Sequence, residues 1–292
     1  MRNNLYLSSA SVVGSNNYQY LFDTLYENNL LNVELSGVHS FLPLEQLTSL
    51  INKEKKRGFN FIFHNYFPPP DVEIVLNILS ENEDTRKKSK NIILDSLKLA
   101  SLTKVDFYAF HPGYYYEAVI NKDGSFKVLS DIKDNTYEFW CKKIKNEIHE
   151  ILNNKENVVD IGIENLFPSP QKKINAFLTT PEEIINFFQD DEIKKERIFF
   201  LLDLGHLEIT CNLLNLNKDK VFDEILEKLE EKIYEIHLSN NDGINDLHSR
   251  IDIDSWQLRC LSSLKNKKIT YESRNLNINQ ILEDIDLIQK YL

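Results

Sequence analysis

The histidines and carboxylates of this sequence gather where short apolar segments end. Five of the seven histidines and four carboxylates occupy such places or the loop that follows one. A carboxylate that closes an apolar segment loses hydration, and a divalent cation is a common compensation for that loss. We therefore predict nine metal ligands: His64, His111, Glu164, Asp203, His206, His237, Asp246, His248 and Glu272.

The types of ligand restrict the metal. Imidazole and carboxylate without thiolate favour Zn²⁺, Mn²⁺ or Fe²⁺ over an all-oxygen calcium site. Nine ligands exceed the number that one ion uses, so we expect one to three divalent ions per chain, Zn²⁺ or Mn²⁺. The three cysteines, Cys141, Cys211 and Cys260, lie far apart, which suits neither a disulfide framework nor a thiolate zinc site.

Two histidines fall outside this set. His149 lies within a helical run, and we expect it to be an ordinary helix residue. His39 follows the second apolar segment in GVHSF, from which it can reach a site, but we expect it at the surface.

Eight short apolar segments alternate with longer helical stretches along the chain. Several, such as FNFIFH and RIFFLLDLGH, are apolar at both alternating sets of positions, which is typical of strands covered on both faces of a parallel sheet. Eight rounds of strand and helix in under 300 residues favour a (β/α)₈ TIM barrel, a single domain over residues 1–292. The predicted strands are Leu5–Ser9, Asn32–Gly37, Phe59–Asn65, Val105–Gly113, Val158–Leu166, Ile198–His206, Ile233–Asn240 and Lys268–Ser273.

The stretches between the strands carry helical signals. Apolar stripes at helical spacing run through residues 85–102, 136–154, 220–232 and 278–292. Thr180 is a predicted N-cap, because Pro181 and two glutamates follow it. Residues 112–130 and 168–180 are predicted loops that are long enough to shape a site. In a barrel of this kind the loops after the strands converge at one face, so the nine ligands are expected to meet there.

The overall composition sets limits on partners. The chain has 45 acidic and 34 basic residues, a formal charge of −11, which argues against binding of nucleic acid through bulk charge. The first residues contain no apolar run of signal-peptide length, and no run approaches 18 apolar residues. We therefore expect a soluble, cytoplasmic protein without a membrane partner.

In these motifs the sequence resembles the xylose-isomerase-like TIM-barrel superfamily, which includes the endonuclease IV group of abasic-site endonucleases and many sugar isomerases and epimerases. The resemblance covers essentially the whole chain. Single motifs are weak, but their order and spacing together are specific. They are FIFHN, AFHPG, IEN, DLGH, HLSNNDG, DLH and YES, in chain order.

The resemblance to endonuclease IV implies a zinc centre for phosphoester hydrolysis. It assigns His64, His111 and Glu164 to a first zinc, with Glu164 as a bridge to a second. Asp203, His237 and Glu272 would complete the second site. The third site would be formed by His206, Asp246 and His248.

The resemblance to the isomerases and epimerases needs a smaller set. It implies one ion held by Glu164, Asp203, His237 and Glu272, with Glu164 and Glu272 moving a proton through an enediolate of a keto sugar. The arginine that the family carries six positions after the strand-seven histidine is absent, since Gly243 stands there. Arg250 or Arg274 is a candidate substitute for contacts to substrate.

The loops favour a carbohydrate substrate over DNA. The loops after the second and third predicted strands contain no arginine or lysine. A protein that holds a DNA duplex needs such residues for contacts to its phosphates. Tyr66 and Tyr114 are expected to line a substrate pocket, where tyrosines stack on sugar faces or on unpaired bases. The sequence thus favours a metal-dependent sugar isomerase or epimerase. The alternatives are an endonuclease IV-like phosphodiesterase with DNA as partner and a non-catalytic metal-binding barrel.

Overall fold

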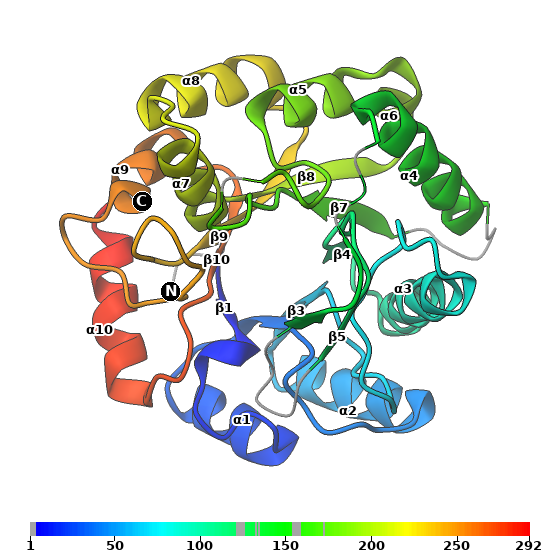
Figure 1. The fold of residues 1–292 in the computed structure, drawn as a ribbon. Helices are drawn as coiled ribbons and strands as arrows, with labels where there is room; N and C mark the ends of the chain where they lie inside the picture. The colour runs from blue at the N-terminus through cyan, green and yellow to red at the C-terminus, as the bar shows by residue number, and fades with distance from the viewer. Residues whose placement is uncertain (1–3, 121–125, 132, 134, 154–158, 172) are drawn as a thin grey trace.

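Eight parallel strands close into a barrel in the computed structural model, which describes residues 4–120, 126–131, 133, 135–153, 159–171 and 173–292. Helices surround the strands (Figure 1). The order around the barrel is β1-β10-β9-β8-β7-β4-β3-β2, and β1 pairs in parallel with both β10 and β2. This confirms the predicted (β/α)₈ barrel. Its strands are β1 (Leu5–Ser8), β2 (Asn32–Leu35), β3 (Asn60–His64), β4 (Phe107–Phe110), β7 (Asp160–Glu164), β8 (Ile198–Asp203), β9 (Ile233–Leu238) and β10 (Lys268–Tyr271).

Most of the helices bury one face against the barrel and begin at a residue whose side chain accepts a hydrogen bond from a backbone N–H. Thr180 accepts a hydrogen bond from the Glu183 N–H, and the Glu183 carboxylate accepts from the Thr180 N–H, so the predicted start at Thr180 and Pro181 is confirmed. The helices are α1 (Tyr18–Glu27), α2 (Leu44–Lys56), α3 (Glu83–Thr103), α4 (Tyr137–Leu152), α5 (Pro181–Gln189), α6 (Asp191–Lys195), α7 (Leu204–Leu213), α8 (Lys218–Leu229), α9 (Trp256–Cys260) and α10 (Ile278–Gln289), with 3₁₀ turns η1 (Ser9–Ser11) and η2 (Leu261–Ser263).

All eight predicted strands extend one to three residues past the C-terminal end of the observed strand, and two further differences change the elements themselves. The sixth predicted strand was extended to His206, but β8 ends at Asp203 and α7 starts at Leu204, because the Asp203 carboxylate caps the helix through the His206 N–H at 2.7 Å. The predicted loop 112–130 contains a hairpin of β5 (Ala118–Ile120) and β6 (Phe126–Val128). Val158, the predicted start of the fifth strand, lies outside the described residues.

Along the barrel axis, an apolar layer of the interior is followed by a polar layer at the C-terminal ends of the strands. Ile62, Phe107, Ala109 and Leu201 pack in the barrel interior with Tyr6. Gly162 leaves room for this floor, since a Cβ there would lie 2.4 Å from the Phe107 ring. Side chains two residues further along the strands point to the same side, toward the C-terminal end. They are His64, His111, Glu164 and Asp203.

No helix within the described part of the chain is long and apolar enough to cross a membrane.

Candidate metal centre

The C-terminal end of the barrel opens into a cavity of about 700 Å³, called the inner cavity here. Seven of the nine predicted ligands line it, and the other two, Asp203 and His237, lie beneath it with at most 1% of their surface exposed. The structure therefore brings together all nine predicted residues. The seven in the wall are His64, His111, Glu164, His206, Asp246, His248 and Glu272.

Glu164, the last residue of β7, is at the centre of these contacts. Its Oε2 lies 2.8 Å from His64 Nε2 and 3.1 Å from His111 Nε2, and its Oε1 lies 3.2 Å from His206 Nδ1. The three imidazoles come from the end of β3, from the turn after β4 and from α7. One carboxylate thus contacts imidazoles from two sides of the site.

Asn165 fixes the neighbouring strand end, and sequence reasoning missed it. Its side chain exchanges two hydrogen bonds with the Asp203 backbone, at 2.8 and 3.1 Å. Its backbone carbonyl accepts a hydrogen bond from His206 Nδ1 at 2.8 Å. His206 Nε2 consequently points toward Asp246, whose Oδ2 is 3.4 Å away. The IEN motif therefore supplies a ligand candidate and the residue that orients two others.

Strand β9 places His237 between two carboxylates. His237 Nδ1 lies 3.0 Å from Glu272 Oε2, and Nε2 lies 2.7 Å from Glu34 Oε2. Glu34, from β2, was also missed, although the alternation of polar Asn32, Glu34 and Ser36 with apolar residues could have indicated an inward-facing polar row.

Asp246 joins the two histidines of the remaining predicted group. Its Oδ2 lies 2.9 Å from His248 Nε2 and 3.4 Å from His206 Nε2. Among the described residues, three groups bring single ligand atoms within 4.8 Å of one another, and Asp246 belongs to none of these. They are Glu34–His64–His237, His64–His111–Glu164 and Glu164–Asp203–His237.

Burial and neighbouring charges shift the pKa values of the site residues, in several cases in opposite directions. Burial raises the pKa of Glu164, but His111, His206 and His64 outweigh it and hold that pKa well below its usual range. Burial, assisted by the Glu164 carboxylate, raises the pKa of Asp203 to about 6. Burial lowers the pKa of His237, yet Glu34 and Glu272 hold it well above its usual range. The site therefore attracts cations, as a metal centre requires.

The predicted ligands fit a metal centre because several of their buried polar atoms have no hydrogen-bond partner. Buried polar atoms in proteins are normally paired, so a cluster of unpaired atoms calls for an additional ligand. Five predicted ligands each keep one buried atom without a hydrogen-bond partner. These atoms are Asp203 Oδ2, His206 Nε2, His237 Nδ1, Asp246 Oδ1 and His248 Nδ1.

Three of the four predicted substrate contacts lie at the inner cavity. Tyr66, Tyr114 and Arg274 line it, and Tyr116 and Phe167 extend the aromatic wall. The Tyr66 hydroxyl accepts the Leu76 N–H at 2.8 Å, which fixes its ring against the loop after β3.

Arg250, one of the two arginines considered for substrate contact, lies away from the inner cavity. Its guanidinium makes a bidentate ion pair with Asp284 of α10, at 2.7 and 2.9 Å, and a further one with Glu283 at 2.8 Å. Arg250 consequently serves to attach the loop after β9 to the outer helix, and it does not line the inner cavity.

His39 is also not where we expected it, because it is buried and not at the surface. Its Nδ1 donates to the Ser15 carbonyl at 2.6 Å, and its Nε2 accepts from the Ser9 hydroxyl at 2.9 Å. Burial lowers its pKa to about 4, so the ring is neutral. His149 lies in α4, as predicted.

Comparisons with known proteins agree with this architecture. An uncharacterized protein of Methanocaldococcus jannaschii is 27% identical over 234 residues, 76% of this chain and 71% of that protein. A D-tagatose 3-epimerase-like protein superposes with a TM-score of 0.71 at 20% identity, over 99% of this chain and 96% of the other. Endonuclease IV from Thermus thermophilus gives a TM-score of 0.62 at 15% identity, over 99% and 98%. The profile of the xylose isomerase-like TIM barrel family matches residues 33–276, and this protein therefore belongs to that family.

Proposed function

We propose that this chain is a divalent-metal-dependent phosphoester hydrolase with a multinuclear centre of the endonuclease IV type. The observation that carries the proposal is the continuity of contacts across the nine ligands. Glu164 touches three imidazoles and Asp246 touches two. The one-ion isomerase scheme uses only four residues as ligands and leaves His64, His111, Asp246 and His248 without a ligand role. The arrangement thus supports hydrolysis more strongly than the sequence did.

We assign the ligands to three sets, following the endonuclease IV pattern. His64, His111 and Glu164 form the first, supported by atoms within 4.8 Å of one another. Glu164, Asp203 and His237 are supported in the same way as the second, to which Glu272 adds a contact of 3.0 Å with His237. His206, Asp246 and His248 form the third, supported by contacts of 3.4 and 2.9 Å. Zn²⁺ fits this mixture of imidazole and carboxylate.

The chain's own groups can bind and orient a phosphoester. Divalent ions held close together polarise a phosphoryl group and supply a nucleophile at neutral pH. Arg274 is the one arginine or lysine among the described lining residues, and it is exposed beside Glu272, where its guanidinium can bind a phosphate oxygen. The aromatic wall of Tyr66, Tyr114 and Phe167 excludes water from one side of the cavity.

The substrate we propose is a small phosphoester with a sugar part, and not duplex DNA. Duplex binding relies on many cationic contacts to phosphates. The loops after β2 and β3 contain no lysine or arginine, and they expose Val38, Phe41 and Val72. Tyrosines in the inner cavity suit the face of a sugar ring.

A metal-dependent sugar isomerase or epimerase is the second candidate. The observation in its favour is that Glu164 and Glu272, from the ends of β7 and β10, both face His237 Nδ1, at 3.9 and 3.0 Å. Two carboxylates around one ion can remove a proton from one face of a keto sugar and return it on the other. Glu164, Asp203, His237 and Glu272 would be sufficient for that reaction.

The test combines metal analysis with two histidine variants. We expect close to three zinc ions per chain in protein purified without chelator, and hydrolysis of bis(p-nitrophenyl) phosphate. His248→Ala should lose one ion and at least about 100-fold in hydrolysis. His149→Ala, a histidine of α4, is the matched control and should change neither quantity.

The outcomes separate the candidate functions. One ion per chain, with ketose epimerisation that survives His248→Ala, would support the isomerase and reject the hydrolase. Cleavage of an abasic duplex at a higher kcat/KM than any small phosphodiester would reject the proposed substrate. Less than one ion per chain would rule out both enzymes and support a non-catalytic barrel.

A further inference from the structure

We propose that Glu34 is a positioning residue of the metal centre: it holds the His237 ring so that Nδ1 faces the ligands and Nε2 faces the barrel interior. The inference rests on the proposed metal centre, to which no motif in the sequence assigned Glu34. The hydrogen bond between His237 Nε2 and Glu34 Oε2 is 2.7 Å long. Both side chains have no exposed surface.

The position of Glu34 in the barrel explains how it reaches His237. Glu34 lies on β2 in register with Ser8 of β1 and Ile62 of β3, and its side chain crosses the interior to β9. A carboxylate buried this completely is costly unless a specific interaction compensates. The Nε2–H of His237 provides one such interaction.

The two nitrogens of His237 have different surroundings. Nδ1 lies 3.0 Å from Glu272 and within 3.9 Å of both Glu164 and Asp203, and it has no hydrogen-bond partner. Nε2 is occupied by Glu34. Because the proton of a ligating histidine sits on the nitrogen opposite the metal, the hydrogen bond to Glu34 selects the tautomer with Nδ1 free.

Glu34 also lies near a second imidazole. Its Oε2 is 4.0 Å from His64 Nδ1, while His64 Nε2 faces Glu164 at 2.8 Å. One buried carboxylate therefore stands behind a ligand of each of the first two sets. We expect the second set to depend on Glu34 more than the first, since the contact to His237 is the shorter.

Glu235 provides a matched control within the same layer. It is equally buried, it lies on β9 two residues before His237, and its Oε1 is 3.8 Å from His237 Nε2, too far for a hydrogen bond. Its side chain instead accepts the hydroxyl of Thr270. Glu235→Gln therefore alters a buried carboxyl of the same layer without removing the support of His237.

The experiment measures zinc affinity by competition with a chromophoric chelator, with circular dichroism to verify folding. Glu34→Leu is expected to weaken the zinc of the second set by about 10 to 100-fold, the usual cost of losing such a partner. Glu34→Gln keeps an acceptor oxygen without the charge and should show a smaller loss, so it carries the test if Glu34→Leu does not fold. Glu235→Gln should stay within about twofold of wild type.

A second readout reports the ring itself. In metal-free crystals of Glu34→Leu or Glu34→Gln, the His237 ring is expected to turn, or to lose its fixed orientation, while it stays as in wild type in Glu235→Gln. Unchanged zinc affinity and an unchanged ring would overturn the role of Glu34. An equal loss in Glu235→Gln would overturn it as well, because the effect would then be a general one on the interior.

The two proposals fail in different ways. A wild-type protein that binds less than one ion contradicts the proposed function, and the ring orientation in the metal-free crystals still decides the role of Glu34. A wild-type protein that binds its ions and a Glu34→Leu variant that binds them equally well contradict only the role of Glu34.

Discussion

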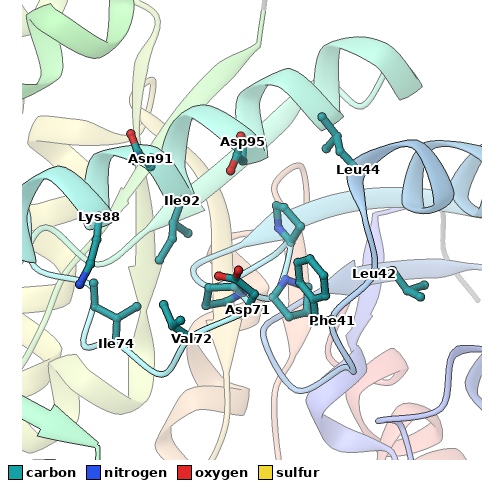
Figure 2. A pocket seen from close by; sticks show the side chains of 13 residues that line it. Phe41, Leu42, Leu44, Asp71, Val72, Ile74, Lys88, Asn91, Ile92 and Asp95 are labelled. Carbon is teal, nitrogen blue, oxygen red and sulfur yellow. The ribbon is translucent and has the colours of Figure 1, made fainter.

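The protein has two neighbouring hollows that differ in how their polar groups are held. The inner cavity is surrounded by strand ends, and its carboxylates and imidazoles contact one another at 2.8 to 3.4 Å. The outer pocket, of about 380 Å³, lies between α3 and the loops after β2 and β3. Figure 2 shows Phe41 and Val72 on those loops, with Lys88, Ile92 and Asp95 on α3.

The comparison shows why only one of these hollows carries a candidate site. In the outer pocket the polar side chains surround an apolar wall of three prolines and Phe41, and none of its lining residues belongs to a metal-ligand group found in the described structure. In the inner cavity neighbouring strands force acidic and basic side chains together. A hollow thus becomes a site when rigid elements bring opposite charges into contact.

The largest expected difference concerns carboxylates of the two hollows. Glu164→Gln should lower kcat/KM by about 10²- to 10⁴-fold and lower the metal content, because one amide replaces a carboxylate that touches three imidazoles. Asp95→Asn, at an exposed carboxyl of the outer pocket, should stay within about twofold of wild type. Steady-state kinetics and elemental analysis of both variants measure the contrast. Equal losses in the two variants would break it.

His39 lies between the inner cavity and the outer pocket, and its pKa is shifted in the opposite direction to those of the cavity histidines. It bonds to Ser9, whose hydroxyl meets Ser36 of the inner cavity, and its ring packs edge-on against Phe67, next to Pro68 of the outer pocket. Its pKa is lowered to about 4, whereas the pKa values of His206 and His237 are raised.

The sign of the pH effect follows from that pKa. Between about pH 6.5 and pH 4 the unfolded chain binds a proton at residue 39 that the folded chain does not, so the stability from His39 is present above pH 6.5 and lost as the pH falls. The loss should reach about 3 kcal/mol in the free energy of unfolding. Urea denaturation of metal-free protein against pH should therefore give a flatter curve for His39→Gln. Parallel curves would show that His39 is not the group responsible.

The smallest expected effect belongs to the outer pocket. Phe41 is 52% exposed, so Phe41→Ser should change the free energy of unfolding by at most about 0.5 kcal/mol and leave metal content unchanged. Thermal denaturation with and without zinc measures both. A large loss of zinc-dependent stabilisation in this variant would mean that the outer pocket is coupled to the inner cavity.

Much of the fold was predictable because it depends on local patterns. Apolar runs such as FNFIFH form strands buried on both faces, and the capping residues at Thr180 start a helix wherever the chain goes next. The nine candidate ligands could be chosen for a similar reason. In a (β/α)₈ barrel the strand ends and the loops that follow them meet at one face, so polar residues at these positions come together.

Residues that depend on distant partners could not be assigned in this way. Arg250 pairs with Asp284 of α10, and His39 with Ser15, partners that no local pattern indicates. Asn165 and Glu34 were missed because their roles arise only when β7 meets β8 and β2 faces β9 across the interior.

The sequence by itself therefore determined which strands form, which of their ends are polar and which candidate ligands those ends carry. The tertiary structure decided which nitrogen of each histidine faces the site, which carboxylate stands behind it and which arginine is already paired. The physical reason is the distance along the chain over which each interaction acts. Backbone periodicity and capping act within a few residues, while hydrogen bonds such as that between Glu34 and His237 join residues 203 positions apart and exist only after the barrel closes.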